Sequence, residues 1–557
     1  MIIEKEKTAL SVRNKWWEQS VVYQVYPRSF YDTNHDGIGD LQGIIRKLDY
    51  LQELGIDVIW LSPVYASPMD DNGYDISDYQ GIADEFGTME DMEELIAEAK
   101  RCNIKIIMDL VVNHTSDEHQ WFTASKTDKL HPQRDWYIWQ NGKEDKPPNG
   151  WQSVFGGSCW EYEPITNQYY MHTFSKKQPD LNWENPRLRQ AIYDMIDWWI
   201  QKGVAGFRVD AITFIKKSFS TAGDEVDIVK ANQHGIDTVL EELSKQSFQK
   251  HDLLTVAEAP GVTLDQLPSY IGENGYFSML FEFDHVDLDL GQDGSWYKPR
   301  NWSLFDFKKA ISDSQHLFNY QGWGALYLEN HDQPRSLNKF IEPAGIGITS
   351  AKMLATTYFL LKGTPFIYQG QELGMTNTIF TSVNDFNDLA SIEQYDAAMK
   401  AGLTEQQALK AIAHRSRDNA RTPMQWDQSE NGGFSKGTPW LPTNSNFLSI
   451  NAESRYAPDS LFTYYQQLIQ LRKNSEYAEV LTYGRYEEVL ASHPDIIAYI
   501  RWDGKKAVAV VANFKNKIVE LDFPYIWGKV ILANYAQPLM NDELQPYECI
   551  LLELINY

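Results

Sequence analysis

Four short phrases of this sequence place acids and histidines directly after apolar, β-rich runs. They are Asp109–His114 (DLVVNH), Gly206–Asp210 (GFRVD), Val256–Ala259 (VAEA) and Glu329–Asp332 (ENHD). In a parallel α/β barrel, the polar residues that follow the strands meet at one mouth, where the chemistry takes place. We therefore expect the four phrases to form a single active site. Three carboxylates that converge in this way suggest sugar chemistry.

Two of the acids have the surroundings that cleavage of a glycosidic bond requires. One carboxyl must protonate the leaving oxygen, while the other attacks the anomeric carbon or activates water. Asp210 follows Arg208 by two residues, so both side chains point the same way and the cation should lower the pKa of a nucleophilic carboxylate. Glu258 ends an apolar strand, which should raise its pKa so that it holds a proton as the general acid. Asp332, beside His331, would bind substrate hydroxyls and help to distort the ring.

The rest of the chain supplies the elements that must position these groups. Short apolar strands alternate with helix-period segments such as Met89–Cys102 and Arg187–Lys202. Eight strands in alternation with helices favour an α/β fold of the TIM (β/α)8 barrel type. An open doubly wound sheet is the alternative, and the lack of a GxGxxG motif after the first strand weakens it. The predicted strands are Val21–Val25, Val58–Leu61, Ile104–Val111, Ala205–Val209, Leu254–Ala257, Ser278–Phe281, Ala325–Tyr327 and Pro365–Tyr368.

Two insertions and a second domain are predicted around the barrel. The interval after strand three is too long for a structureless loop and predicts an inserted subdomain that walls the cleft. A further insertion, Thr376–Arg415, contains a helical run over Thr404–His414. After about Thr482, short strands with turns between them predict an antiparallel β-domain. The predicted division is a catalytic barrel over 1–114 and 186–480, an inserted subdomain over 115–185, and a C-terminal β-sandwich domain over 481–557. The predicted strands of this last domain are Ile496–Trp502, Ala507–Asn513, Ile518–Leu521 and Lys529–Ala533.

Composition narrows the class of protein. The chain has 557 residues and a formal net charge of -27. An acidic surface repels phosphate backbones, so nucleic acid is not an expected partner. The chain has three cysteines, an odd number at wide spacing, which argues against a disulfide framework or a cysteine metal site: Cys102, Cys159 and Cys549. The start has no apolar signal region, and no run approaches the roughly 20 apolar residues of a membrane span, so we expect a soluble cytoplasmic protein, as a monomer or a homodimer.

The four phrases resemble the signature regions of the α-amylase family of glycoside hydrolases, family thirteen. The resemblance runs from Tyr23–Phe30 (YQVYPRSF) to the C-terminal β-domain. It is closest to the oligo-1,6-glucosidase and α-glucosidase branch, whose markers are similar to Asp71–Tyr79 (DNGYDISDY), Phe174–Trp183 (FSKKQPDLNW) and Ser416–Trp426 (SRDNARTPMQW). This likeness implies a retaining mechanism through a covalent glucosyl-enzyme.

The resemblance also assigns the catalytic roles. Asp210 would be the nucleophile, Glu258 the acid/base and Asp332 the transition-state stabiliser. A retaining mechanism further predicts that the carboxyls of the first two lie about 5 Å apart. A single acid after a strand is often no more than a helix cap or a salt-bridged carboxylate, so the inference depends on all of them occurring in barrel order.

Substrate-binding residues follow from the same resemblance. His114, Arg208 and His331 would bind hydroxyls of the non-reducing glucose. Asp71 and Arg421 would pair and close the far end of the pocket. A closed end leaves no room for the chain to continue, so the enzyme would remove single glucoses from short oligosaccharides or disaccharides.

Aromatic and amide side chains would complete this pocket. The resemblance implies that Tyr74 stacks on the sugar ring. It also implies that Phe155, Phe174 and Gln178 reach the pocket from the inserted subdomain. For Phe155, plain packing is the main alternative.

An acidic loop near the N-terminus could bind a metal. Oxygen-bearing residues alternate around a central Gly37, a pattern that can wrap Ca²⁺. Gly43 stands where an EF-hand needs a glutamate, so the loop is not an EF-hand. Relatives in the branch carry a similar loop with Ca²⁺ or Mg²⁺, which implies a structural ion here and no organic cofactor, while a polar turn without metal is the alternative. The expected ligands are Asp32, Asn34, Asp36, Ile38 and Asp40.

One residue bears on which bond is cleaved. Ala211 follows the nucleophile, where members of the branch that prefer α-1,6 links carry valine and those that prefer α-1,4 links carry alanine. We therefore expect a retaining, exo-acting α-glucosidase that favours maltose and malto-oligosaccharides. The alternatives are an oligo-1,6-glucosidase that acts on isomaltose and isomalto-oligosaccharides, or a sucrose- or trehalose-acting glucosyltransferase or isomerase. The segment Phe283–Leu290 lacks the arginines of such isomerases. A non-catalytic transporter subunit is disfavoured, because the acids are kept and no membrane helix is seen.

Overall fold

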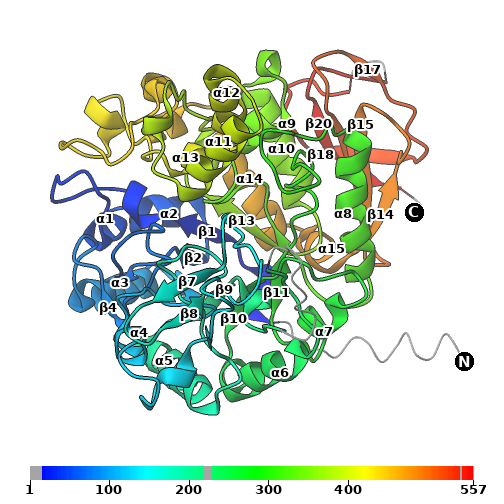
Figure 1. Cartoon of the computed structure of the whole chain (residues 1–557). Coiled ribbons are helices and arrows are strands. Elements are labelled where there is room, and N and C mark those ends of the chain that lie inside the picture. The colour runs from blue at the N-terminus through cyan, green and yellow to red at the C-terminus, as the bar shows by residue number, and fades with distance from the viewer. Residues whose placement is uncertain (1–14, 219–228, 540–541, 556) are drawn as a thin grey trace, which may run out of the picture.

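An eight-stranded parallel barrel forms the centre of the molecule (Figure 1). The computed structural model describes residues 15–218, 229–539, 542–555 and 557. The barrel strands are β1 (Val22–Val25), β2 (Val58–Leu61), β5 (Lys105–Val111), β9 (Gly206–Asp210), β10 (Leu254–Glu258), β11 (Met279–Phe281), β12 (Ala325–Leu326) and β13 (Thr364–Tyr368). Each overlaps one of the eight predicted strands, so the predicted TIM-barrel fold is confirmed.

The register of the barrel strands brings the catalytic phrases together. All residues of β1, β2 and β9 are buried, as expected for strands that are covered on both faces. The ladder order is β11-β10-β9-β5-β2-β1-β13-β12, and a bridge between Leu280 and Gly324 joins its two ends. Arg208 of β9 lies level with Asp109 of β5 and with Val256 of β10. The polar residues that end these strands therefore emerge at one mouth.

Helices cover the outside of the barrel, and local sequence signals set their ends (Figure 1). Thr88 and Asp91 form a reciprocal capping box at the start of α3, and Asn185 caps α5. The α5 helix ends at Gly203, whose φ of 106° is a left-handed conformation that glycine adopts without strain. The main covering helices are α2 (Leu48–Leu54), α3 (Met89–Arg101), α5 (Pro186–Lys202), α6 (Ile236–Gln246), α8 (Leu304–Phe318), α10 (Ile348–Phe359) and α14 (Leu461–Asn474).

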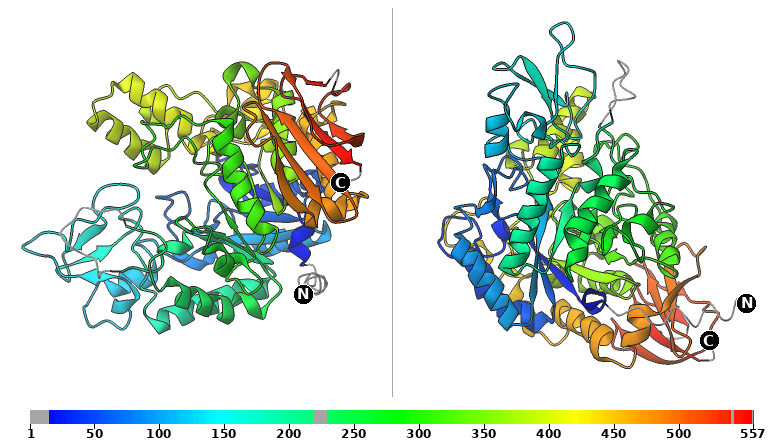
Figure 2. Two further views of the ribbon diagram at one scale, coloured as in Figure 1. Left: turned by 90° about the vertical axis from the view of Figure 1, so that its right-hand side faces the viewer. Right: turned by 90° about the horizontal axis from the view of Figure 1, so that it is seen from below.

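Two insertions project from the same side of the barrel (Figure 2, left). The first contains α4 (Gln120–Ser125) and a three-stranded antiparallel sheet in the order β6 (Trp139–Gln140), β8 (Gln168–Met171), β7 (Trp160–Glu163). The second contains α11 (Leu389–Lys400) and α12 (Glu405–Arg415). The α12 helix covers the helical run expected from the sequence, whereas α11 was not predicted.

A short hairpin between β2 and α3 was also missed by the sequence analysis. Its strands, β3 (Tyr65–Ala66) and β4 (Asp78–Ile82), pair antiparallel. The loop between them is folded around Asp75, whose carboxylate accepts hydrogen bonds from the backbone N–H groups of Asp70 and Asp71. The hairpin matters because its loop carries two residues of the pocket described below.

The C-terminal domain is antiparallel, as predicted. A five-stranded sheet has the order β14 (Arg485–Val489), β15 (Ile496–Trp502), β16 (Ala507–Asn513), β20 (Cys549–Leu554), β18 (Trp527–Ala533), and β17 (Val519–Glu520) pairs with β19 (Glu543–Leu544). The domain is fixed to the barrel by Tyr499, whose hydroxyl donates to the carbonyl of Thr357 at 2.9 Å. Arg501 donates in the same way to the carbonyl of Leu360 at 2.7 Å. Across the described ranges, the helices are all too short or too polar to cross a membrane.

Candidate active site

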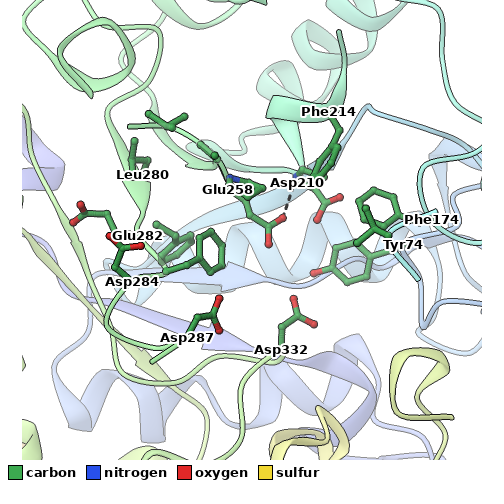
Figure 3. Close-up of a pocket in the computed structure, with 18 of the residues that line it drawn as sticks. Tyr74, Phe174, Asp210, Phe214, Glu258, Leu280, Glu282, Asp284, Asp287 and Asp332 are labelled. Atoms are coloured by element: carbon green, nitrogen blue, oxygen red, sulfur yellow. Dashed lines mark hydrogen bonds between the residues drawn. The ribbon is translucent and has the colours of Figure 1, made fainter. Parts of the chain in front are cut away.

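A cavity of about 710 Å³ opens at the carboxyl ends of the barrel strands, and the three expected catalytic acids line it (Figure 3). Asp210 ends β9, Glu258 ends β10, and Asp332 lies in the loop after β12. The structure thus brings together acids that are separated by up to 122 positions in the chain, from 210 to 332. The remaining phrase, after β5, contributes His114 to the same cavity.

A single buried arginine connects the first two acids. One guanidinium nitrogen of Arg208, Nη1, lies 2.6 Å from Asp210 Oδ1 and 2.6 Å from Asp109 Oδ1. The other, Nη2, lies 2.9 Å from Glu258 Oε2. The carboxyl groups of Asp210 and Glu258 therefore contact neighbouring nitrogens of one guanidinium, and both line the cavity. This placement suits two acids that act on the same anomeric carbon. Trp60 donates its indole N–H to Asp109 Oδ2 at 2.8 Å and so holds the Asp109 carboxylate in place beside Arg208.

Arg208 lowers the pKa of Asp210, as expected, but the net shift of this pKa is upward, which the sequence analysis did not predict. Burial raises the pKa of Asp210 to about 6, and the adjacent guanidinium only limits the increase. The reason is that a carboxylate removed from water loses more hydration than one shared arginine restores. The charged form still predominates at neutral pH, as a nucleophile requires.

Glu258 has the raised pKa expected of a general acid, although its surroundings are not simply apolar. Its Oε2 accepts a hydrogen bond from the backbone N–H of Ala211 at 3.0 Å, in addition to the contact with Arg208. Burial nevertheless raises its pKa to about 7, and the nearby carboxylates of Asp210 and Asp332 add to the increase. At Ala211 the backbone adopts a left-handed φ of 43°, which turns its N–H toward this carboxyl.

Asp332 differs from the other two acids in its partners. Its Oδ2 lies 3.0 Å from His331 Nε2, and its Oδ1 lies 3.1 Å from Arg417 Nη1 and 2.9 Å from Arg421 Nη2. Burial opposes ionisation, but these neighbours hold the pKa of Asp332 well below its usual range. It is therefore ionised at neutral pH, which suits a group that stabilises positive charge.

One end of the cavity is closed by an ion pair, but the arginine is not the one expected. Asp71 Oδ1 lies 3.5 Å from Arg417 Nη2, whereas Arg421 binds Asp332 and the carbonyl of His331. Both arginines belong to the motif Ser416–Trp426 and are four residues apart, so the sequence could not tell which one reaches the hairpin loop. Burial raises the pKa of Asp71 to about 6, although the positive charges of Arg417 and Arg421 lower it.

The predicted binding residues divide into two groups. Those that line the cavity are Asp71, Tyr74, His114, Phe155, Phe174 and Ala211. The others are fully buried behind the lining and hold it in place; they are Gln178, Arg208, His331 and Arg421. Sequence patterns showed that these side chains belong to the site, but they could not show which of them face the substrate.

His331 illustrates how a buried residue supports the lining. Its imidazole lies parallel to the ring of Tyr74, with centroids 5.4 Å apart, and its Nε2 is 2.6 Å from the Tyr74 hydroxyl. Gln24 contacts the other ring nitrogen at 2.8 Å. The histidine thereby fixes both the tyrosine and Asp332, and its role is to position groups that face the cavity.

The inserted subdomain supplies an aromatic and amide wall. The ring of Phe174 lies 5.4 Å from that of Phe155 and 5.6 Å from that of Phe214. Gln178 donates its amide to Asp71 Oδ2 at 3.0 Å and lies 3.2 Å from His114 Nε2. Burial lowers the pKa of His114 to about 4, so this imidazole is neutral at pH 7.

A lysine that the sequence analysis did not identify connects this wall to the nucleophile strand. Lys217 Nζ lies 2.8 Å from Asn113 Oδ1, 2.9 Å from Thr173 Oγ1 and 3.1 Å from Asp180 Oδ2, and it also donates to the carbonyl of Phe214. Its partners come from the end of β5, the subdomain and the loop after β9. A lysine seven residues beyond Asp210 has no distinctive sequence context, so only the fold reveals its position.

The acidic loop near the N-terminus folds around its own backbone. Asp32 accepts hydrogen bonds from the N–H groups of His35 and Gly37, and Asp36 accepts from that of Ile38. Asp40 caps α1 (Leu41–Arg46) instead, because Gly43 N–H donates to its Oδ1 at 2.6 Å. Among the residues that the structure describes, no group of three or more acidic, histidine or cysteine side chains is arranged to hold a metal ion.

Comparison with known proteins agrees with this geometry. Residues 24–484 match the α-amylase catalytic-domain family. The chain is 47% identical over 553 residues to an oligo-1,6-glucosidase of Parageobacillus thermoglucosidasius, covering 96% of this chain and 98% of that one. It is 46% identical over 562 residues to an oligo-1,6-glucosidase of Bacillus cereus, covering 98% and 100%. Among solved structures, an isomaltulose synthase from Klebsiella sp. LX3 superposes with a TM-score of 0.93 at 38% identity, covering 98% and 100%.

The barrel, the paired acids and the closed pocket define a glycoside hydrolase. The chain belongs to the α-amylase family, glycoside hydrolase family thirteen, and its relatives support glucosidase activity.

Proposed function

We propose that the protein is an exo-acting α-glucosidase that hydrolyses α-1,6 links at the non-reducing end of short isomalto-oligosaccharides. The similarity to oligo-1,6-glucosidases over almost the whole chain supports this bond more strongly than Ala211 supports α-1,4 links. The preference for maltose that we expected from this one residue is therefore replaced by the alternative reading. The observation that carries the exo-acting hydrolysis is the placement of three acids beside a pocket end closed by Asp71 and Arg417, whereas the choice of bond rests on the relatives.

The arrangement supports a retaining double displacement. The carboxylate of Asp210 attacks the anomeric carbon while Glu258 protonates the leaving oxygen, which gives a covalent glucosyl-enzyme and a free aglycone. Glu258, now ionised, takes a proton from water, and that water attacks the anomeric carbon to release glucose and regenerate both acids. A pKa of about 6 for the nucleophile and about 7 for the acid/base leaves each group in the protonation state that its first step needs.

The remaining side chains orient and stabilise the sugar. Asp332, held ionised by Arg417 and Arg421, faces the ring on which positive charge develops. Tyr74 and Phe174 line the closed end, where they bury the apolar faces of a single glucose. Because that end has no exit, the bond presented to the acids is the one nearest the non-reducing terminus.

One panel of substrates tests both the activity and the bond. Initial rates should be measured on isomaltose, maltose, sucrose, trehalose and starch, with the products identified and the anomer of the first-released glucose followed by NMR. We expect isomaltose to be the best substrate, glucose to be released as the α-anomer, and starch to react poorly. Faster hydrolysis of maltose would overturn the bond assignment alone. Conversion of sucrose mainly to isomaltulose would identify an isomerase instead.

The metal remains a prediction, as do the cytoplasmic location and the monomeric or dimeric state. The loop fits an ion only in part, because Asp40 serves as a helix cap and Asp32 is bound to loop amides. Asp32, Asn34, Asp36 and the carbonyl of Ile38 would hold Ca²⁺ or Mg²⁺ only after exchanging some of these hydrogen bonds. Melting curves with EDTA, Ca²⁺ or Mg²⁺ test the site: a structural ion raises the melting temperature of the parent but not of Asp32→Asn.

A further inference from the structure

The catalytic pocket has two chemically different halves (Figure 3). Tyr74 and Phe174 lie on one side of the catalytic acids, toward the closed end. Leu280, Glu282 and Asp284 lie on the other side. If a glucose occupies the closed end, its leaving group must extend along the second side, which we call the aglycone half.

Apolar side chains form much of the wall of the aglycone half. They come from the loop after β10, the start of α7 (Leu267–Ile271), β11 and the loop that follows β11. Leu264, which is 46% exposed, is the most open of them. The apolar lining residues are Val262, Leu264, Leu267, Leu280 and Phe283. A surface of this kind favours aglycones with an apolar body.

This half carries an uncompensated negative charge on Asp284 and a second acid, Glu282, that becomes charged at higher pH. Asp284 is exposed and Glu282, directly after β11, is half-buried, and within the described ranges neither carboxyl group has an ion-pair partner. Burial raises the pKa of Glu282 to about 8, so at neutral pH Asp284 carries the charge. By contrast, Asp287 in the same loop pairs with Arg415 Nη2 at 2.5 Å. His285 adds no positive charge, because burial lowers its pKa to about 4 and its Nε2 contacts the carbonyl of Tyr327.

We infer that Asp284, together with Glu282 when that acid is ionised, makes the aglycone half selective for a positively charged group on an apolar body and disfavours phosphorylated or other anionic aglycones. The inference rests on the proposed function, since it concerns the leaving group of the same reaction. A charge at the rim of a low-dielectric cavity acts on an incoming ion without a direct contact, and like charges brought close together reduce binding.

Three aryl α-glucosides of matched shape provide the test. The phenyl ring carries, at its 4-position, a trimethylammoniomethyl, a neopentyl or a sulfomethyl group, so the charge is +1, 0 or −1 and does not change with pH. At low ionic strength we expect kcat/KM to fall in the order cation, neutral, anion, with a cation-to-anion ratio of about tenfold or more. Raising the salt concentration to about 1 M should reduce this ratio, because charges at an exposed rim are screened.

Single substitutions assign the effect to the two acids. Asp284→Asn should lower the cation-to-anion ratio at pH 7. Glu282→Gln should lower it mainly at pH 9, where this acid is ionised, and at that pH the double substitution should bring the ratio close to that of the parent in high salt. Glu520→Gln is the matched control, since it removes one exposed acid from β17 in the C-terminal domain and should leave the ratio unchanged. Comparing ratios within each variant cancels differences in leaving-group reactivity and in the amount of folded enzyme.

The pH dependence of the ratio gives a second readout. Burial, together with Asp284 on the same loop and Asp313 on α8, raises the pKa of Glu282 to about 8. Other charged or titratable groups near this acid are His285, which is neutral, and Tyr327, whose hydroxyl donates to the Glu282 carbonyl. The cation-to-anion ratio of the parent should therefore rise between pH 7 and pH 9, whereas that of Glu282→Gln should rise less.

The outcomes separate this inference from the proposed function. Absence of hydrolysis of all three glucosides, with the Asp210→Asn variant equally inactive, would overturn the proposed function. Hydrolysis with the same cation-to-anion ratio in the parent, Asp284→Asn and Glu520→Gln would leave the glucosidase intact and overturn the charge selectivity. A salt-independent ratio in the parent would also overturn it, without any variant.

Discussion

The two ends of the catalytic pocket use the same residue type in opposite ways. At the closed end, the carboxylates of Asp71 and Asp332 contact arginines, and Arg417 binds both of them and Asp388. At the aglycone end, Asp284 carries no such partner in the described part of the chain. Acids that are paired with arginines keep the closed end in a fixed shape. An acid without an ion-pair partner can instead interact with a charge on the ligand. The difference shows that partners, more than residue type, decide what an acid does.

The largest expected effect lies at the boundary between the two ends. Asp210→Asn removes the nucleophile, and we expect kcat/KM to fall by at least about 10⁴-fold for every glucoside. Glu258→Gln removes the proton donor, so the decrease in kcat/KM should depend on the aglycone. We expect a decrease of roughly 10²–10⁴-fold for isomaltose but a far smaller one for a 2,4-dinitrophenyl α-glucoside, whose leaving group needs no protonation. Rates on both substrates check this. Equal losses for Glu258→Gln on the two substrates would contradict its assignment as the acid.

A smaller effect is expected when the compensation at the closed end is removed. Arg417→Gln leaves Asp71, Asp332 and Asp388 with less positive charge nearby, so the carboxylates repel one another and the glucose site loses its shape. We expect kcat/KM on isomaltose to drop about 100-fold. The matched control, Arg455→Gln, breaks a surface pair with Glu53 and should have almost no effect. A near-parental rate for Arg417→Gln would show that the closed end does not need its ion pairs.

The attachment of the inserted subdomain to the barrel should depend on the buried side chain of Lys217. Lys217→Met leaves Asp180 buried without its cation, and we expect the free energy of unfolding to fall by about 3 kcal/mol. Urea denaturation measures this change. Lys245→Met is the control, because Lys245 pairs with Glu241 on the surface. If both variants were equally stable, the lysine would not be what joins the subdomain to the barrel.

The pH profile tests the acids that separate the two ends. Asp210 must be ionised, so kcat/KM should fall about tenfold per unit as the pH drops below about 6. Glu258 must be protonated, so kcat/KM should also fall as the pH rises above about 7. The profile on isomaltose should therefore be bell-shaped, with its maximum between these values. In Glu258→Gln, assayed with the dinitrophenyl glucoside, the alkaline limb should disappear; its persistence would assign that limb to another group.

The smallest effect is expected at Ala211, which lines the pocket beside the nucleophile. Ala211→Val adds two methyl groups next to the position where the aglycone enters, and it should shift the isomaltose-to-maltose ratio of kcat/KM several-fold toward isomaltose. Measuring both substrates on the parent and the variant checks this. An unchanged ratio would mean that the bond preference is set elsewhere in the aglycone half.

The sequence alone determined the barrel and most of the members of its site. Apolar runs that are followed at once by Asp210, Glu258 and Asp332 predict strand ends, and parallel strands in a barrel have their carboxyl ends at one mouth. These are local patterns, so they can be read from the chain without knowing which distant segments meet.

Only the tertiary structure decided how the site residues are paired and charged. Arg417 and Arg421 carry equivalent chemistry four positions apart, and packing against Asp71 selected the first. The pKa of Asp210 rises because burial outweighs its arginine, a balance that depends on the neighbours of both groups in space. Lys217 joins three segments that lie far apart along the chain, and no local pattern marks it. Local sequence sets which strand carries each group, whereas desolvation and ion pairing depend on three-dimensional neighbours that the sequence does not specify.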